Sequence, residues 1–361
     1  PQTLLRDVTD SLDRAAGDDR IQAVVLDLDG LQGGGLAKLQ AIGEKVRAVR
    51  AAGKKVIAVG SSFTRDQYYL ASQADEVIME ELGVVYLDGY EYYRTFFRSA
   101  LDKLSVDLNV FRVGEFKSFV EPFTRDDMSE EDREASRVWL AALWAAWERD
   151  VREARELPAG ALQSYADDLA AKLEAEQGNA AAAALKAGLV DTLMSRPEIE
   201  QYLIGLVGES QAEEGTFSAV DFRAYALATG IERRLQDGKE RNVGVVVASG
   251  QIVDGEAAPG VVGGDTLAAE LRQARLDSPG ASMFASEVIF DEITALKAAG
   301  KPVVASMSSV AASGGYYIAM QADEIWARDT TITGSIGVGA LVPTIPRTLD
   351  RLGVHGDGFG T

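Results

Sequence analysis

A serine followed by two glycines lies at residues 313–315, in the sequence VAASGGYYIAMQAD. The apolar run PVVASM before it predicts a buried strand, and the residues after it predict a helix. A serine at such a junction has its hydroxyl at the positive end of a helix dipole, near the N–H groups of the first turn. Ser313 is therefore a candidate nucleophile, and the N–H of Gly314 is a candidate donor to the oxyanion of an acyl-transfer intermediate.

The composition limits which residue could activate this serine. The chain has 361 residues, one histidine and no cysteine. That histidine, His355, lies in the glycine-rich stretch LGVHGDGFG, where a loop or strand-edge role is expected. Lys117 lies among four phenylalanines between residues 111 and 123, and desolvation there would disfavour its ammonium form. To act as a base near neutral pH, its pKa would have to fall from about 10.4 to about 7, or roughly 4 kcal/mol.

Two further turns carry groups that could complete a site. The segment DSPGAS places Gly280 in a turn of the kind that binds ligands at strand ends, so its N–H is a candidate second oxyanion donor. The segment TITGSIG follows the predicted strand QADEIW, and its Ser335 could hold the lysine amine in place. Each segment is also typical of an ordinary turn.

The chain contains an internal repeat. Residues 51–80 read AAGKKVIAVGSSFTRDQYYLASQADEVIME, and residues 298–327 read AAGKPVVASMSSVAASGGYYIAMQADEIWA. Alignment on the paired tyrosines, at an offset of 248, places Ser313 opposite Arg65, or opposite Asp66 if the one-residue gap is moved. The equivalent of Lys117 would fall at position 365, beyond the last residue. One copy offers a lysine without a serine and the other a serine without a lysine, which predicts a site assembled between the halves.

The order of the predicted elements indicates an α/β protein. Short apolar runs alternate with amphipathic segments of 10–15 residues, which predicts βαβ units and a largely parallel sheet in each copy. The strand LNVFRV at 108–113 is expected to complete the first sheet, and Ser129 is expected to cap a following helix. We expect a first repeat at 1–128, a helical linker at 129–240 and a truncated second repeat at 241–361.

The second copy departs from the first at one place. NVGVVVASG predicts a strand, but LAAELRQARL runs straight into DSPGAS, with no counterpart of the strand IQAVVLDL. A parallel sheet does not easily lose an interior strand, because its neighbours would be left with unpaired backbone groups. We therefore predict that residues are missing from the sequence at the join Leu276–Asp277–Ser278.

Charge and hydropathy exclude several functional classes. A net charge of −20 argues against a nucleic-acid partner or an anionic membrane surface. No apolar run reaches the 18 residues that a helix needs to span a bilayer. The sequence has no initiating Met or signal peptide and stops within a motif, so we expect a piece of a longer product. No metal or organic cofactor is expected.

Four motifs together resemble one family. VFRVGEFKSFVEPFTRDDMS, DSPGAS, MSSVAASGGYYIAMQADEIWA and TITGSIGVGA, in this order on tandem half-repeats, resemble the long bacterial form of the signal peptide peptidase A family. The resemblance implies two tandem ClpP/crotonase-like domains and a serine protease with a Ser/Lys dyad. Ser313 would be the nucleophile and Lys117 the general base, with Ser335 supporting the lysine. Gly280 and Gly314 would be the oxyanion donors, although SPGA replaces the family's usual SPGG and leaves Ala281 as an alternative to Gly280.

The resemblance also implies a setting. It suggests a membrane-anchored homotetramer of the bacterial inner membrane, with its catalytic domain in the periplasm and peptide substrates, namely cleaved signal peptides. Whether the dyad forms within one chain or across subunits is left open. Two other functions fit the same pattern. An acyl-CoA hydratase or isomerase of the crotonase class uses the same oxyanion architecture, and a non-catalytic, membrane-associated assembly protein would retain the fold with an idle serine.

Overall fold

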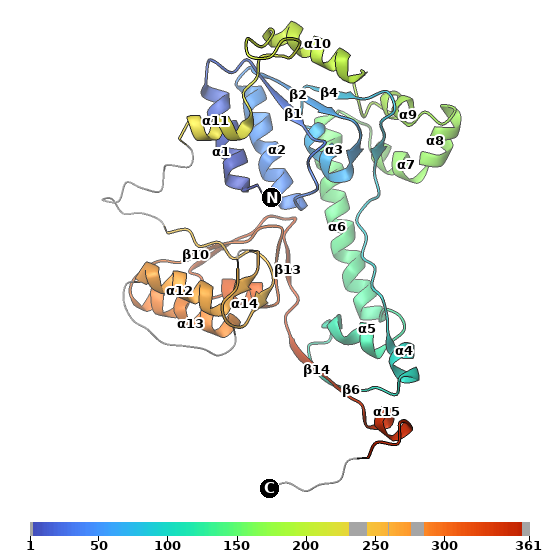
Figure 1. The fold of residues 1–361 in the computed structure, drawn as a ribbon, viewed down its shortest axis with the longest axis vertical. Helices are drawn as coiled ribbons and strands as arrows, with labels where there is room; N and C mark the ends of the chain where they lie inside the picture. The colour runs from blue at the N-terminus through green and yellow to red at the C-terminus, as the bar shows by residue number, and fades with distance from the viewer. Residues whose placement is uncertain (1–2, 231–243, 259, 276–284, 356–361) are drawn as a thin grey trace. The chain divides into compact units, whose positions relative to one another are not determined.

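The structure is a computed structural model that describes residues 3–230, 244–258, 260–275 and 285–355. The chain folds as two compact units, each made from two stretches of sequence (Figure 1). Unit 1 comprises residues 1–90 and 143–243, and unit 2 comprises residues 91–142 and 244–361. The expected boundaries at 128 and 240 follow the repeats along the chain and stay a prediction. In space, Lys117 and Ser313 both belong to unit 2.

Unit 1 is built on a four-stranded parallel sheet. Its strand order is β1 (Ala23–Asp27), β2 (Lys55–Gly60), β4 (Glu76–Met79) and β7 (Thr192–Leu193). The central strands are apolar on both faces, and Ile57 and Ile78 are fully buried against Leu203 of a covering helix. Burial on both faces is the reason that parallel strands read as continuous apolar runs.

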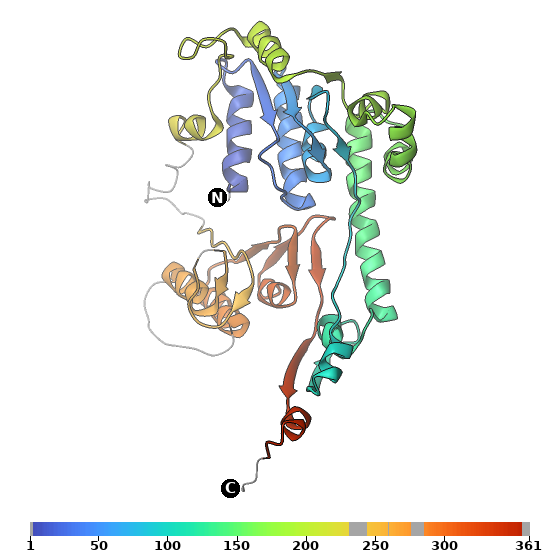
Figure 2. The ribbon, with the colours of Figure 1, turned by 45° about the vertical axis from the view of Figure 1, so that its right-hand side comes forward.

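Helices surround this sheet, and the first two pack side by side (Figure 2). The short strands β3 (Phe63–Thr64) and β5 (Val85–Tyr86) form a second parallel pair. Trp147 is fully buried and stacks on Trp144. The helices of unit 1 are α1 (Leu5–Gly17), α2 (Leu36–Ala51), α3 (Arg65–Ala71), the second half of α6 (Glu130–Ala154), α7 (Ala161–Asp167), α8 (Leu169–Ala175), α9 (Ala180–Lys186), α10 (Arg196–Val207) and α11 (Phe222–Ala228).

The described residues of unit 2 form four two-stranded pairs. β8 (Ile252–Val253) pairs with β9 (Val262–Gly263), β10 (Val304–Ser306) with β12 (Glu324–Trp326), and β11 (Val310–Ala312) with β13 (Ile332–Gly334), all in parallel. β6 (Asp107–Val113) pairs antiparallel with β14 (Val338–Thr344). The helices are α4 (Arg98–Lys103), the 3₁₀ turn η1 (Ser118–Val120), α5 (Glu121–Thr124), the first half of α6, α12 (Gly264–Arg275), α13 (Ala285–Ala298), α14 (Gly314–Ala319) and α15 (Pro346–Arg351).

The apolar core of unit 2 lies between α12 and α13. Leu267 and Leu271 of the first helix meet Ile289 and Ile293 of the second, with Val262 of β9 against them. The spacing of these side chains by three or four residues gives each helix one apolar face, which is the pattern that buries an amphipathic helix.

The repeat in the sequence is a repeat of elements. The parallel pairs β2–β4 and β3–β5 of unit 1 correspond to β10–β12 and β11–β13 of unit 2, and α3 follows β3 as α14 follows β11. At the offset of 248, Thr64 pairs with Tyr86 as Ala312 pairs with Gly334, so Arg65 occupies the position of Ser313. The α/β class with parallel strands is therefore confirmed.

Two local expectations differ from the structure. The strand at 108–113 forms as β6, but it pairs with β14 of unit 2 and does not complete the first sheet. A strand's sequence pattern fixes which face is apolar and leaves its partner open. Residues 244–249 carry no strand, although NVGVVVASG predicted one. The second copy also lacks a counterpart of the strand IQAVVLDL. The join Leu276–Asp277–Ser278, where residues were predicted to be missing, lies outside the described residues.

Candidate active site

Ser313 occupies the turn between β11 and α14. Its backbone has φ 54° and ψ −116°, a conformation that residues other than glycine rarely adopt. The turn is held because the Ser313 N–H donates to the Gly334 carbonyl at 2.8 Å and the Ser313 carbonyl accepts from Tyr317 at 2.9 Å. Strain of this kind is retained where the surrounding structure imposes it, commonly at functional sites. Here it presents an exposed hydroxyl at the end of a strand.

Ser335 lies beside Ser313 because of strand pairing. β11 and β13 are parallel, and Ala312 pairs with Gly334. The residues that follow each strand, Ser313 and Ser335, therefore leave the pair at the same edge. Ser335 also has a positive φ, 48°, so both serines sit in turns that begin abruptly at strand ends.

Lys117 reaches this edge from the antiparallel pair. Val113 at the end of β6 pairs with Val338 at the start of β14, so the loop that carries Lys117 meets the loop that carries Ser335. Gly337 makes this approach possible, with a φ of 144°. A Cβ at Gly337 would lie 2.5 Å from the Val113 carbonyl oxygen and 3.5 Å from the Lys117 Cβ.

The lysine amine has three close oxygen neighbours. Lys117 Nζ lies 2.9 Å from Ser313 Oγ, 2.8 Å from the Ser335 carbonyl oxygen and 3.1 Å from Ser335 Oγ. Burial lowers the pKa of the Lys117 amine from its ordinary value. The four phenylalanines between residues 111 and 123 are themselves 38–62% exposed, so they do not form the enclosed aromatic pocket that the sequence suggested.

The other residues considered from the sequence are Gly314, Gly280 with its alternative Ala281, and His355. Gly314 is the first residue of α14, and a Cβ there would lie 2.8 Å from Ser286 Oγ. Gly280 and Ala281 lie outside the described residues, so the second oxyanion donor stays a prediction. The His355 side chain is 73% exposed, and its Nδ1 lies 3.3 Å from an Asp350 carboxylate oxygen. In the described part of the chain, no group of three or more His, Asp or Glu side chains has an arrangement that could hold a metal ion.

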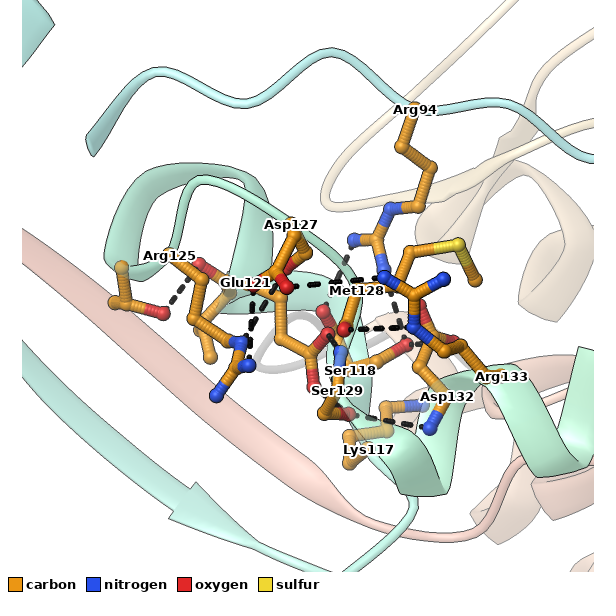
Figure 3. Close-up of polar contacts among 12 residues, drawn as sticks. Arg94, Lys117, Ser118, Glu121, Arg125, Asp127, Met128, Ser129, Asp132 and Arg133 are labelled. Atoms are coloured by element: carbon orange, nitrogen blue, oxygen red, sulfur yellow. Dashed lines mark hydrogen bonds and ion pairs between the residues drawn. The ribbon is translucent and has the colours of Figure 1, made fainter. Parts of the chain in front are cut away.

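Three residues beside the lysine were missed from the sequence. Arg94, Ser118 and Asp132 form a network directly adjoining Lys117 (Figure 3). Sequence analysis singled out the start of α6 through Ser129, and Ser129 Oγ does accept the Asp132 N–H at 3.1 Å. Nothing local showed that the carboxylate of this first helical turn contacts a residue 38 positions earlier.

The equivalent turn in unit 1 holds an arginine. The Arg65 guanidinium donates to the Gly89 carbonyl and lies 3.1 Å from Asp66 and 3.6 Å from Asp88. It also lies 3.9 Å from the centre of the Tyr90 ring. A cation with fixed partners therefore lies at the position that Ser313 occupies in unit 2.

Among the described helices, none has the length and apolar composition needed to cross a membrane.

In a comparison of solved structures, an enoyl-CoA hydratase/isomerase family protein from Silicibacter pomeroyi aligns with 51% of this chain and 84% of its own. Its sequence is 18% identical to this chain, and the TM-score is 0.19.

Similarity to known sequences extends along nearly the whole chain. A Protease 4 from Salmonella typhi is 39% identical over 368 residues, covering 99% of this chain and 58% of its own length. A Protease 4 from Haemophilus influenzae is 38% identical over 367 residues, covering 98% and 59%. A chloroplastic serine protease SPPA from Arabidopsis thaliana is 27% identical over 366 residues, covering 97% and 52%. The chain thus spans less than two thirds of these relatives.

The resemblance read from the motifs is confirmed at the level of the family. The profile of peptidase family S49 matches residues 48–203 and 295–361, which is more than half of the sequence and includes both Lys117 and Ser313. The chain therefore belongs to peptidase family S49.

Proposed function

We propose that this protein is a serine endopeptidase in which Ser313 is the nucleophile and the neutral amine of Lys117 is the general base. The observation that carries the proposal is the 2.9 Å separation of Lys117 Nζ and Ser313 Oγ, which allows direct proton transfer. Membership of a peptidase family supports peptide-bond hydrolysis. The structure supports the choice of these two residues.

The contacts of the amine suit its uncharged form. A neutral amine has two N–H donors and one lone pair, whereas an ammonium has three donors and no lone pair. Ser335 offers two acceptors, its carbonyl and hydroxyl oxygens, for the two donors. The lone pair is then directed to the Ser313 hydroxyl. Burial of the amine favours the same form, and a peptide seated over the exposed serine would remove further water.

In the proposed reaction, one nitrogen takes and returns a proton in each of two steps, acylation and deacylation. Ser313 Oγ attacks the peptide carbonyl while Lys117 takes its proton, and the Gly314 N–H donates to the oxyanion. Gly280 or Ala281 would supply the second N–H. Lys117 returns the proton to the leaving amine, so that the peptide C–N bond breaks and an acyl-enzyme forms. Water then attacks the acyl-enzyme while Lys117 takes its proton, and Lys117 returns that proton to Ser313 Oγ as the ester C–O bond breaks and the acid leaves.

The proposed substrates are cleaved signal peptides, bound as extended apolar segments. A relative from Enterococcus faecium named "Putative signal peptide peptidase SppA" is 38% identical over 79 residues, or 22% of this chain. We propose a location at the bacterial inner membrane, through an anchor on the whole protein, with the catalytic part in the periplasm. The family resemblance supports both points.

A homotetramer is the proposed assembly. Apolar side chains on the β6–β14 pair support further subunit contacts, since Phe111, Val113, Val338 and Val342 are all exposed. Monomeric proteins rarely expose large contiguous apolar patches. The mass of the whole protein in solution, from light scattering, tests this: a monomer at all concentrations would contradict it.

The catalytic proposal is tested with a quenched fluorescent apolar peptide and a serine-directed phosphonate. We expect the Ser313→Ala and Lys117→Ala variants to lose at least about a thousandfold in kcat/KM while keeping their circular dichroism spectra. The phosphonate should label the unmodified protein and not Ser313→Ala. Full activity in either variant would refute the mechanism. Turnover of a CoA thioester instead of the peptide would favour a hydratase, and no labelling at all would favour an assembly protein.

A further inference from the structure

We propose that Arg94 and Asp132 are positioning residues for Lys117, and that their ion pair clamps Ser118, the residue that follows the lysine, so that the lysine amine is held at Ser313. The inference rests on the proposed function, because it concerns the same base. Neither residue contacts the reacting atoms, so each would act through the backbone that carries the lysine.

The clamp joins three separate elements at one point (Figure 3). Arg94 lies in the extended segment before α4, Ser118 is the first residue of η1, and Asp132 lies in the first turn of α6. Arg94 Nη1 lies 2.9 Å from Asp132 Oδ2, and Ser118 Oγ donates to Asp132 Oδ1 at 2.8 Å. Arg94 Nη2 donates to the Ser118 carbonyl at 2.9 Å. The two charged side chains are only 12% and 7% exposed, so this pair is far from a solvated surface contact.

A second contact fixes Asp132 itself. Ser129 Oγ accepts the Asp132 N–H at 3.1 Å and donates to Glu121 Oε1 at 2.5 Å. Glu121 Oε2 accepts the Ser129 N–H at 3.0 Å, and the Glu121 side chain is buried. The segment from Ser118 to Glu121 is thus tied to the start of α6 at both ends. Lys117 is the residue that directly precedes this tied segment.

Such restraint matters because the lysine side chain is long. Four rotatable bonds separate its amine from the backbone, and a misplacement of about 1 Å can reduce a rate by about a hundredfold. The Lys117 stem is restrained on one side by Gly114 and Gly337, against which its Cβ lies closely. The Arg94–Asp132 clamp restrains the backbone on the other side.

The clamp also leaves no net charge beside the base. Arg94 and Asp132 balance each other, and burial lowers the pKa of Lys117. The other charged groups nearby are Arg112, which donates to the Lys117 carbonyl at 3.4 Å, the exposed Glu115, and Glu121, which is bonded to Ser129. The segments that face the amine, 314–315 and 331–345, contain no charged residue.

The test compares Arg94→Met, Asp132→Asn and their double variant in the whole protein. We expect each to lower kcat by about 10–100-fold with KM changed less than about threefold, because positioning of the base is lost and the peptide groove is not. The double variant should resemble the single ones, since the pair acts as a unit. The matched control is Arg98→Met, which breaks an exposed ion pair to Asp102 on α4 of the same unit and should have no effect. Equal behaviour of Arg94→Met and the control would overturn the proposal.

Titration of the lysine separates positioning from general damage. The pH dependence of Lys117 acetylation, read by mass spectrometry, requires no peptidase activity. Arg94→Met leaves the Asp132 carboxylate unbalanced and should move the titration to higher pH, whereas Asp132→Asn leaves Arg94 and should move it to lower pH. Shifts of opposite sign support the clamp even if no peptide is cleaved, in which case the proposed function alone fails. Identical titrations in an active enzyme would refute the clamp.

Two milder variants test the same proposal if Arg94→Met or Asp132→Asn folds poorly. Ser118→Ala keeps the ion pair and removes the hydroxyl link, so kcat should fall only a few-fold. Arg94→Lys keeps the charge but loses the two-armed contact, and it should restore part of the rate relative to Arg94→Met. A Ser118→Ala or Arg94→Lys enzyme with a rate below that of Arg94→Met would contradict the clamp.

Discussion

Ser335 contacts the lysine amine twice, through its carbonyl and its hydroxyl oxygen. Replacement by alanine removes only the hydroxyl contact, so we expect kcat to fall about tenfold, near 1.4 kcal/mol of barrier, with little change in KM. Because Ser335 has a φ of 48°, alanine keeps the backbone strain that any Cβ has at this position. Ser335→Gly removes the same hydroxyl without that strain and is the control. Unchanged kcat in Ser335→Gly would show that the hydroxyl does not orient the base.

The pH dependence of the reaction should report Lys117. Only the neutral amine can accept a proton, so kcat/KM should fall as the pH drops below the pKa of the base and be constant above it. Burial lowers that pKa, so the plateau should begin at a lower pH than it would for a free lysine, whose pKa is about 10.4. Initial rates between pH 5 and 10 measure this.

His355 provides the control for that profile. Its imidazole is exposed and lies near Asp350, so the His355→Ala variant should have the same profile as the unmodified protein. A loss of the acidic limb in His355→Ala would assign the base to the imidazole and contradict the role of Lys117.

At the scale of elements, the start of α6 is a structural support that should also affect activity. Ser129→Ala removes the cap of α6 and the partner of buried Glu121, which should lower the free energy of unfolding by about 1–2 kcal/mol in denaturant titrations. Ser195→Ala removes a comparable cap from α10 in unit 1, where Ser195 pairs with Glu198. Both variants should lose stability, and only Ser129→Ala should lose kcat. Equal kcat in both would disconnect α6 from the lysine.

The junction between β13 and β14 depends on a glycine. A side chain at Gly337 would collide with the Val113 carbonyl and would be strained at a φ of 144°. Gly337→Ala should therefore separate the β6–β14 pair locally and lower kcat more than tenfold. Gly353→Ala, at a φ of 72° with open space around it, adds strain without a collision and serves as the control. An active Gly337→Ala enzyme would show that this pair does not place Lys117.

An element could be predicted from the sequence where neighbouring residues determine it, and could not where residues far along the chain determine it. The helix after the SGG triplet was indicated because local pattern and turn chemistry determine it. The run PVVASM does form a strand, β10, but it is largely exposed, and the strand that ends at Ser313 is the separate, three-residue β11, which the sequence did not mark. The strand at 108–113 was also recognised, but its partner β14 was not, since register is set by contacts far along the chain. Arg94 and Asp132 escaped notice for the same reason: their partners are 24 and 38 residues away.

At the scale of the molecule, the repeats and the compact units divide the chain differently. Lys117 belongs to the first repeat as predicted from the sequence and Ser313 to the second, yet residues 91–142 and 244–361 form one unit. The stretch from 91 to 142 therefore leaves the fold of its own repeat and brings Lys117 to Ser313 of the second repeat. The candidate site was predicted between the two halves of the sequence. In the structure its residues lie within unit 2, where the β6–β14 pair joins their two stretches of chain.

The equivalent strand–turn–helix junctions after β3 and β11 hold different residues, Arg65 and Ser313, and this difference leads to a final prediction. In a Ser313→Ala background, Arg65→Ser recreates a serine at the equivalent turn of unit 1. Its surroundings are Asp66, Asp88 and Tyr90, with no amine among these contacts to take its proton. We expect no peptide cleavage and no phosphonate label on the new serine. We also expect a stability loss of about 1–3 kcal/mol, since two carboxylates lose their cation. Arg6→Ser, which breaks the exposed pair with Asp10, should leave stability unchanged. Labelling of the new serine would mean that the turn alone activates the hydroxyl, and the lysine would lose its assigned role.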